Sequence, residues 1–331
     1  MVNKVLEVID LKKYFPVTRG LLDIFMRRSK EYVKAVDGIS FYIERGETLA
    51  LIGESGCGKT TTGRVILRLE EPTAGKIVFM GKDITSLKPK ELRPLRKEMQ
   101  MIFQDPYASL NPRMRIGEQI IHPLLIHGLA TPKEAREMAI EMLKRVGLTP
   151  AHEFYDRFPH QLSGGQRQRV VIARAMILKP KFVVADEPVS MIDVSMRASI
   201  LDLLQGFRKE YQLSMLFITH DISIGRIISD RIAVMYLGKI VEIGPTEEVI
   251  RNPRHPYTRA LIDAVPSIVR RKRKKKLRIM GEVPDPRNPP SGCRFHPRCP
   301  FATEECSKTE PDLIEISGNH FVRCYHPLAP E

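Results

Sequence analysis

The stretch that decides the fold is GESGCGKT, residues 53–60, which matches the pattern G-x-x-x-x-G-K-[ST]. An apolar strand is predicted before it, over residues 48–52, and a helix after it, over residues 60–69. Glycines let backbone N–H groups turn inward around phosphate oxygens, and the helix start adds the positive end of its dipole. The context predicts a nucleoside triphosphate site, with Lys59 on the β- and γ-phosphates and the Thr60 hydroxyl on Mg²⁺.

A second motif, FVVADE at residues 182–187, joins four apolar residues to two carboxylates. Short apolar runs here and at residues 215–218 are typical of parallel strands covered on both faces. Ligands bind at the carboxyl ends of such strands. Asp186 is therefore expected in the Mg²⁺ shell, and Glu187 is expected to act as general base on the attacking water.

A third motif, LSGGQ at residues 162–166, opens a predicted helix, with Ser163 as its N-cap. Two glycines expose backbone N–H groups there, which predicts a second anion-binding site. The three motifs, in this order and at these separations, resemble the ATPases of ABC transporters.

The resemblance assigns further residues. Gln104 matches the Q-loop glutamine that contacts Mg²⁺, His220 the switch histidine on the γ-phosphate, and Asp193 the D-loop aspartate. Tyr14 is expected to stack on adenine, with Tyr32 as the rival. The residues expected to contact nucleotide are Tyr14, Gly53, Ser55, Gly56, Cys57, Gly58, Lys59, Thr60, Thr61, Gln104, Ser163, Gly164, Gly165, Gln166, Asp186, Asp193 and His220.

The resemblance also implies a fold and a mode of action. The expected fold is α/β, a P-loop NTPase core of ABC type with an antiparallel β subdomain and a helical subdomain at about residues 105–165. This ATPase domain is expected to cover residues 1–264, followed by a cysteine-rich extension over residues 265–331. Two chains would face head to tail, so that the LSGGQ motif of one completes the ATP site of the other. Closing of this dimer on ATP would drive the coupled membrane domains.

Composition bounds the class of protein. The 331 residues are 43% hydrophobic and 28% charged, which excludes a largely disordered chain. No apolar run is long enough to span a bilayer, and residues 1–14 lack a signal peptide's apolar region, so a cytosolic protein is expected.

The net charge of +14 is concentrated in one run, RRKRKKKLR at residues 270–278, where eight of nine residues are basic. The rest of the chain is only mildly basic, so the charge does not predict a nucleic-acid-binding face. The run is interpreted first as a solvated linker, then as a contact to anionic lipid, and last as a nucleic-acid tail.

Further stretches, most of them near the C-terminus, indicate a subfamily of these ATPases. The sequences NPRHPYTRAL (residues 252–261), GEVP (281–284) and FQDPYASLNPR (103–113) resemble the ATPases of oligopeptide/dipeptide importers. The resemblance implies a heterodimer with a sister ATPase, two transmembrane permease subunits and an extracytoplasmic substrate-binding protein, at the cytoplasmic face of the membrane. Oligosaccharide or nickel remains an alternative cargo. A soluble ATPase acting on nucleic acid or ribosomes, and a regulatory subunit that binds ATP without hydrolysis, are the competing hypotheses.

Four of the five cysteines, Cys293, Cys299, Cys306 and Cys324, lie in the last forty residues with the spacing C-x5-C-x6-C-x17-C. Four thiolates suit a [4Fe–4S] cluster or tetrahedral Zn²⁺, and zinc sites usually offer C-x2–4-C pairs, which are missing here. The resemblance also implies a [4Fe–4S] cluster. Two disulfides are the third alternative.

Overall fold

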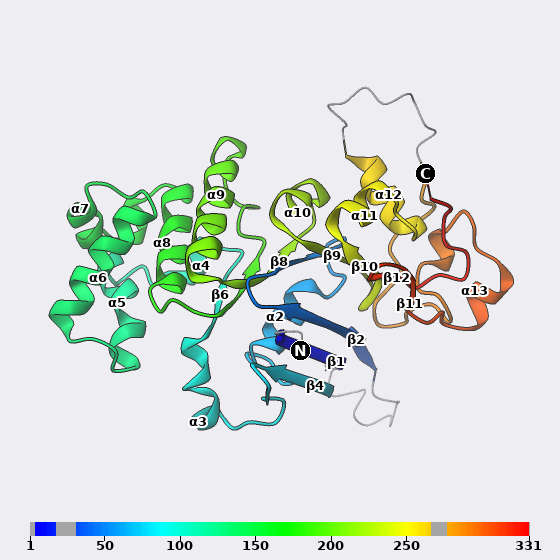
Figure 1. Cartoon of the computed structure of the whole chain (residues 1–331), viewed down its shortest axis with the longest axis horizontal. Helices are drawn as coiled ribbons and strands as arrows, with labels where there is room; N and C mark the ends of the chain where they lie inside the picture. The colour runs from blue at the N-terminus through cyan, green and yellow to red at the C-terminus, as the bar shows by residue number, and fades with distance from the viewer. Residues whose placement is uncertain (1–3, 18–30, 266–276, 331) are drawn as a thin grey trace, which may run out of the picture. The chain divides into compact units, whose positions relative to one another are not determined.

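The computed structural model describes residues 4–17, 31–265 and 277–330 (Figure 1). The chain divides into two compact units that are interleaved in sequence. The first comprises Ile43–Thr48 and Phe79–Ile218, with the start of the chain up to Leu6. The second comprises Glu7–Tyr42, Leu49–Val78 and Thr219–Glu331.

The first unit contains three neighbouring parallel strands, β6 (Met99–Ile102), β7 (Phe182–Asp186) and β8 (Ser214–Thr219). Ala185 pairs with Ile102 on one side and with Phe217 on the other. Every residue of β7 and β8 is buried, as the apolar runs predict for strands covered on both faces.

Most helices of the first unit follow β6 in the chain (Figure 1). Within the helical subdomain expected at about residues 105–165, α5 (Ile116–Ile126) and α6 (Pro132–Arg145) pack on each other and on α7 (Ala151–Asp156). Thr131 starts α6 with a capping box, in which its hydroxyl and the Glu134 carboxylate satisfy each other's backbone N–H groups. The remaining elements of this unit are β5 (Lys82–Asp83), α3 (Pro89–Leu92), η1 (Leu95–Lys97), α4 (Pro106–Ser109), η2 (Pro159–Gln161), α8 (Gly164–Met176) and α9 (Val194–Tyr211).

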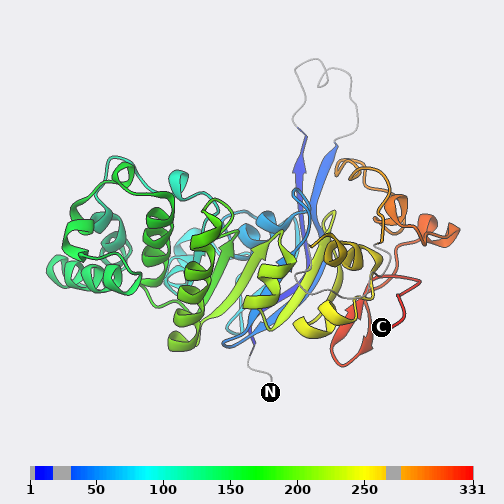
Figure 2. The ribbon, with the colours of Figure 1, turned by 90° about the horizontal axis from the view of Figure 1, so that it is seen from above.

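In the second unit one sheet has the order β11-β12-β10-β9-β3. Strand β3 (Thr48–Ile52) pairs in parallel with β9 (Arg231–Tyr236), and β9 pairs antiparallel with β10 (Lys239–Pro245). The β9–β10 pair forms a hairpin that turns at Leu237 and Gly238. In the other sheet β1 (Lys4–Pro16) lies between β2 (Tyr32–Glu44) and β4 (Ala74–Phe79). Figure 2 shows β1 and β2 as two long blue strands side by side.

The helices of the second unit are short. They are α2 (Lys59–Ile66), α10 (Ile222–Ile228), α11 (Thr246–Arg251), α12 (Pro256–Ala264), η3 (His296–Arg298) and α13 (Glu304–Lys308). Within the ranges that the structure describes, no helix is both long enough and apolar enough to cross a bilayer. Residues 270–276 of the basic run lie outside the described residues.

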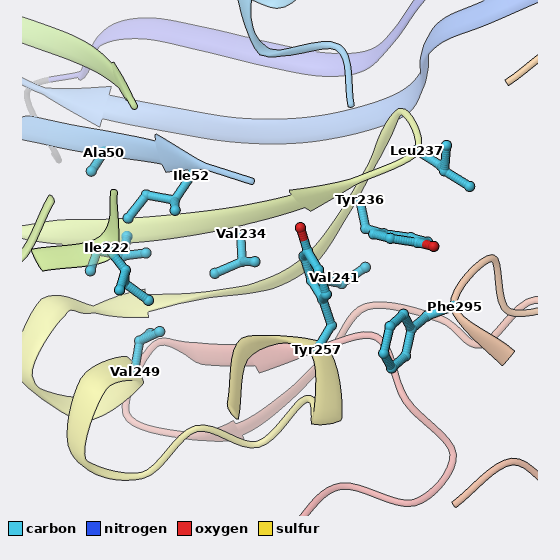
Figure 3. Close-up of a cluster of buried hydrophobic side chains, with 11 residues drawn as sticks. Ala50, Ile52, Ile222, Val234, Tyr236, Leu237, Val241, Val249, Tyr257 and Phe295 are labelled. Carbon is cyan, nitrogen blue, oxygen red and sulfur yellow. The ribbon is translucent and has the colours of Figure 1, made fainter. Parts of the chain in front are cut away.

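The C-terminal tail adds to this unit's core. Its strands β11 (Ile314–Ser317) and β12 (His320–Val322), which the sequence reasoning missed, extend the sheet, with β12 antiparallel to β10. Phe295 is 1% exposed and packs with Tyr236 and Tyr257 (Figure 3). The tail is poor in apolar residues and buries Phe295 in an existing core, whereas Met280, Val283, Phe301 and Ile314 stay exposed.

Candidate nucleotide-binding site

The loop at residues 53–60 connects β3 to α2, as the motif requires. Lys59 is 5% exposed, and its ammonium folds back over the loop. Its Nζ donates to the carbonyl oxygens of Gly53 at 2.8 Å and Glu54 at 3.0 Å. This contact holds the charge at the mouth of the loop, where the backbone N–H groups at the start of α2 also converge.

Two glycines of the loop are required by close packing. Gly58 has φ +108°, and a Cβ placed on it would lie 2.0 Å from the carbonyl oxygen of Ala35. A Cβ on Gly53 would lie 2.2 Å from the carbonyl oxygen of Met235. Both contacts are with backbone, so the loop accepts no larger residue at these positions without rearranging.

Tyr14, the predicted adenine-stacking residue, lies on β1 in the same unit, and its hydroxyl donates to the carboxylate of Asp37. Burial raises the pKa of Tyr14, and Asp37 raises it further. Burial alone would raise the pKa of Asp37, but the Tyr14 hydrogen bond and the charges of Lys239 and Arg294 lower it. Asp37 is therefore ionised, and its carboxylate holds the hydroxyl end of the Tyr14 side chain. The rival Tyr32 is exposed at the start of β2.

His220 directly follows β8 and is exposed. The next residue, Asp221, caps α10 by accepting from the Ser223 N–H at 2.8 Å. This cap fixes the chain at the point where the predicted switch histidine leaves the strand.

In the first unit, Asp186 and Glu187 stand at the carboxyl end of β7, as predicted. Asp186 is 2% exposed. Glu187 is half-buried with φ +43°, and its carboxylate accepts a hydrogen bond from Gln104, with 3.3 Å between Nε2 and Oε2. The structure therefore brings together two residues that are 83 positions apart in the chain.

The LSGGQ motif starts α8. The Ser163 hydroxyl accepts from the Gln166 N–H, and the Gln166 side chain accepts from the Ser163 N–H at 3.0 Å, which forms a capping box. A Cβ on Gly164 or Gly165 would meet nothing closer than 3.5 Å, which is ordinary van der Waals contact. The nearest backbone to Gly164 is the carbonyl of Met191, two residues before Asp193, which is the exposed N-cap residue of α9.

The chain matches two family models. Residues 36–190 match the model described as "ABC transporter", and residues 241–306 match "Oligopeptide/dipeptide transporter, C-terminal region". The chain is 49% identical over 324 residues to the oligopeptide transport ATP-binding protein AppF of Bacillus subtilis, covering 97% of each chain. It is 44% identical over 320 residues to the dipeptide transport ATP-binding protein DppF of Escherichia coli, covering 97% of this chain and 93% of that one.

The chain belongs to the ATP-binding subunits of ABC transporters. It is an ABC-type ATPase of the oligopeptide/dipeptide transporter class, as the motifs predicted. Two solved structures are similar to this ABC subunit. The dimeric post-hydrolysis state of the cassette MJ0796, bound to ADP and phosphate, has a TM-score of 0.64 and 28% identity, over 73% of this chain and 98% of that one. The cbiO1 subunit of Clostridium perfringens has a TM-score of 0.62 and 29% identity, over 75% and 90%. The predicted fold class is therefore confirmed.

The four tail cysteines of this ABC subunit are free thiols that line one cavity, together with His296 and His326 among others. The pKa of Cys293 is raised to about 11 and that of Cys324 to about 12, mainly by burial and in smaller part by the neighbouring thiols. No group of three or more His, Cys, Asp or Glu side chains is arranged to hold a metal ion among residues 4–17, 31–265 and 277–330.

Several residues at the nucleotide loop escaped the sequence reasoning. They are Asp37, Tyr236, Tyr257, Arg294 and Arg298, all of which contact the loop or its immediate neighbours. Their contacts join positions up to 257 residues apart, and no local pattern signals them. The one available signal was that Arg294 and Arg298 each precede or follow a cysteine of the tail directly.

Proposed function

We propose that this ABC subunit hydrolyses ATP to power the import of oligopeptides or dipeptides. The supporting observation is that relatives named as oligopeptide and dipeptide transport ATP-binding proteins align over nearly the whole chain, including the tail. Oligosaccharide and nickel remain the alternative cargoes, because cargo selection belongs to other subunits.

The chemistry we propose uses the two carboxylates at the carboxyl end of β7, Asp186 and Glu187. Water attacks the γ-phosphorus, the bond to the bridging oxygen of ADP breaks, and Glu187 takes the proton of the water. The hydrogen bond from Gln104 orients the Glu187 carboxylate. His220 contacts the γ-phosphate, and Lys59 holds the β- and γ-phosphates.

The residues proposed for Mg²⁺ fit its preference for oxygen ligands. They are the Thr60 hydroxyl, the Gln104 side-chain oxygen and the buried Asp186 carboxylate. When bound, the ion neutralises phosphate charge as the γ-phosphate leaves. The nucleotide contacts proposed for Tyr14, Ser55, Gly56, Cys57 and Thr61 rest on their places in β1 and in the loop.

The position of the LSGGQ motif at the start of α8 supports a dimer. Ser163, Gly164, Gly165 and Gln166 of one chain are proposed to complete the ATP site on the P-loop of a second ATPase, with Asp193 near the same contact. The similar cassette MJ0796 was solved as a dimer. We propose a heterodimer with a homologous sister subunit. We further propose that it binds two permease subunits at the cytoplasmic face of the membrane and is supplied by an extracytoplasmic binding protein.

We also propose a [4Fe–4S] cluster on Cys293, Cys299, Cys306 and Cys324. The fit rests on the donor set, because four thiols line one cavity, and soft thiolates are the ligands of Fe–S clusters. A single Zn²⁺, the alternative, needs four sulfurs about 2.3 Å from one point. When bound, the cluster would hold the cysteine-containing segments of the tail together.

Co-purification tests the proposed assembly. The subunit is tagged and isolated from native membranes in mild detergent, and its companions are identified by mass spectrometry. Two polytopic membrane proteins and a second ATPase support the importer. A complex that instead carries nucleic acid or ribosomal proteins refutes it.

A further inference from the structure

The tail reaches the phosphate-binding loop through Arg298. Its Nη1 donates to Glu54 Oε2 at 3.0 Å, and its Nη2 donates to Glu54 Oε1 at 3.4 Å. The side chain of Arg298 is 10% exposed and that of Glu54 is 28% exposed. A guanidinium this far removed from water needs a carboxylate partner, so Glu54 is more than a surface residue of the loop.

Glu54 is held on its backbone as well. Its N–H donates to the Tyr257 hydroxyl at 3.0 Å. The Tyr257 ring packs against Tyr236 at 4.8 Å between centroids, and Phe295 of the tail packs against both at 5.3 and 5.4 Å (Figure 3). Arg298 also donates to the Tyr236 hydroxyl at 3.4 Å. Glu54 is therefore tied to the tail through one ion pair and one packed aromatic cluster.

The position of Arg298 depends on the cysteine segment. It ends η3 (His296–Arg298), between Cys293 and Cys299. Cys293 N–H donates to the Cys306 carbonyl at 2.8 Å, and Cys299 N–H donates to the His296 carbonyl at 3.2 Å. Any change in how these cysteines are held therefore moves the arginine that binds the loop.

A second arginine of the same segment makes a parallel tie. Arg294 is 7% exposed at its side chain and donates to Asp37 and to the carbonyl of Leu237. Gly238, which follows Leu237 in the chain, donates its N–H to the carbonyl of Cys57 in the loop at 2.9 Å. Arg298 thus contacts the loop directly, and Arg294 is linked to it through Leu237 and Gly238.

We infer that Arg298 is a positioning residue of the nucleotide site, which holds Glu54 so that order in the cysteine-rich tail and ATP affinity are coupled. The inference rests on the proposed ATP site but not on the proposed cargo. Coupling between two sites is reciprocal. An ordered tail holds the loop in the conformation that binds phosphate and so raises the affinity for ATP. Bound ATP in turn stabilises the ordered tail. The coupling requires only that the tail be ordered, whichever group the cysteines hold.

Nucleotide affinity gives the first test. The full-length Arg298→Ala variant is compared with Arg287→Ala, which removes an exposed tail arginine paired only with Asp285 among the contacts described. A fluorescent ATP analogue should bind Arg298→Ala about tenfold more weakly, a change of about 1.4 kcal/mol, because the variant loses the charged hydrogen bonds to Glu54. Hydrogen exchange of residues 53–60 should accelerate in Arg298→Ala only. Equal affinity in the two variants overturns the inference.

A second variant covers the case in which Arg298→Ala does not fold. Glu54→Gln removes the same ion pair from its more exposed side and should weaken the analogue in the same direction. In the double variant the two losses should not add, because both remove one interaction. Fully additive losses would contradict the pairing.

The reciprocal measurement separates positioning from simple stabilisation. Hydrogen exchange of residues 293–306 is followed with and without ATP. Bound ATP should slow exchange in the wild-type tail by severalfold, and the effect should vanish in Glu54→Gln measured at saturating ATP. Protection that persists in Glu54→Gln, or that is absent in the wild type, refutes the coupling.

Discussion

The side-chain amide of Gln104 donates to the carboxylate of Glu187 across 3.3 Å, and it joins the segment after β6 to the end of β7. Glu187 holds a left-handed backbone with φ +43°, and its N–H is bonded to the Ile218 carbonyl at 3.0 Å. A non-glycine residue in this conformation costs free energy, so its surroundings must impose it. These contacts hold the Glu187 carboxylate in one orientation, as a general base requires.

Glu187→Gln should therefore bind ATP as tightly as the wild type and hydrolyse it roughly 10²–10⁴ times more slowly. The amide keeps the size of the side chain but cannot take a proton from water. Single-turnover hydrolysis and the affinity for an ATP analogue are measured on the same preparation. Unchanged turnover would remove Glu187 from the proposed role.

Gly58→Ala should abolish ATP binding. The added Cβ would stand 2.0 Å from a backbone carbonyl oxygen, and the φ of +108° disfavours any side chain. Gly206→Ala is the matched control, since Gly206 lies in α9, where an added methyl group would meet no atom within 4 Å, and the variant should gain up to about 1 kcal/mol of stability. Equal binding by both variants would mean that the loop tolerates a different shape.

His255 should make folding stability depend on pH. Burial lowers the pKa of His255 to about 3 from 6.5, and its neutral Nδ1 accepts from the Tyr257 N–H at 3.1 Å. Between pH 6.5 and 3 the unfolded chain binds a proton that the folded chain excludes, so stability falls as pH falls through this window.

His255→Asn keeps an N-cap acceptor but removes this titration. Between about pH 6.5 and about pH 5.5 the wild type should lose about 1 kcal/mol more than the variant in urea unfolding. The nearby Glu242 accepts from the His255 N–H in both proteins, so its own contribution should largely cancel. Parallel pH profiles would show that His255 is not the group responsible.

The cysteine proposal predicts a metal content. Anaerobically purified protein should contain about four iron and about four sulfide per chain. Cys306→Ser should lose them, whereas Cys57→Ser should keep them, because Cys57 lies in the phosphate loop. Zinc alone, or no metal in the wild type, would refute the cluster.

Much of this structure could be predicted from local patterns. The strand at residues 48–52 follows from an apolar run and is confirmed, and the hairpin that turns at Leu237 and Gly238 joins two apolar runs. The capping box at Ser163 follows from spacing alone, since its two partners are three residues apart.

The rest depends on contacts between distant segments. Strands β11 and β12 are short and partly exposed, and β12 exists as a strand through its pairing with β10. The Arg298–Glu54 pair spans 244 positions, and neither residue belongs to a pattern with a period. Sequence reasoning finds such a pair only after the tail has been placed beside the loop.

Peptide uptake tests the central claim most directly. Right-side-out vesicles that carry the complete complex are loaded with ATP in their lumen, on the side of this subunit, and entry of a labelled di- or tripeptide is measured. We predict ATP-dependent accumulation that is lost in Glu187→Gln. Peptide uptake that is indifferent to ATP and to Glu187→Gln, or a complex whose ATPase responds to no peptide, would contradict the account.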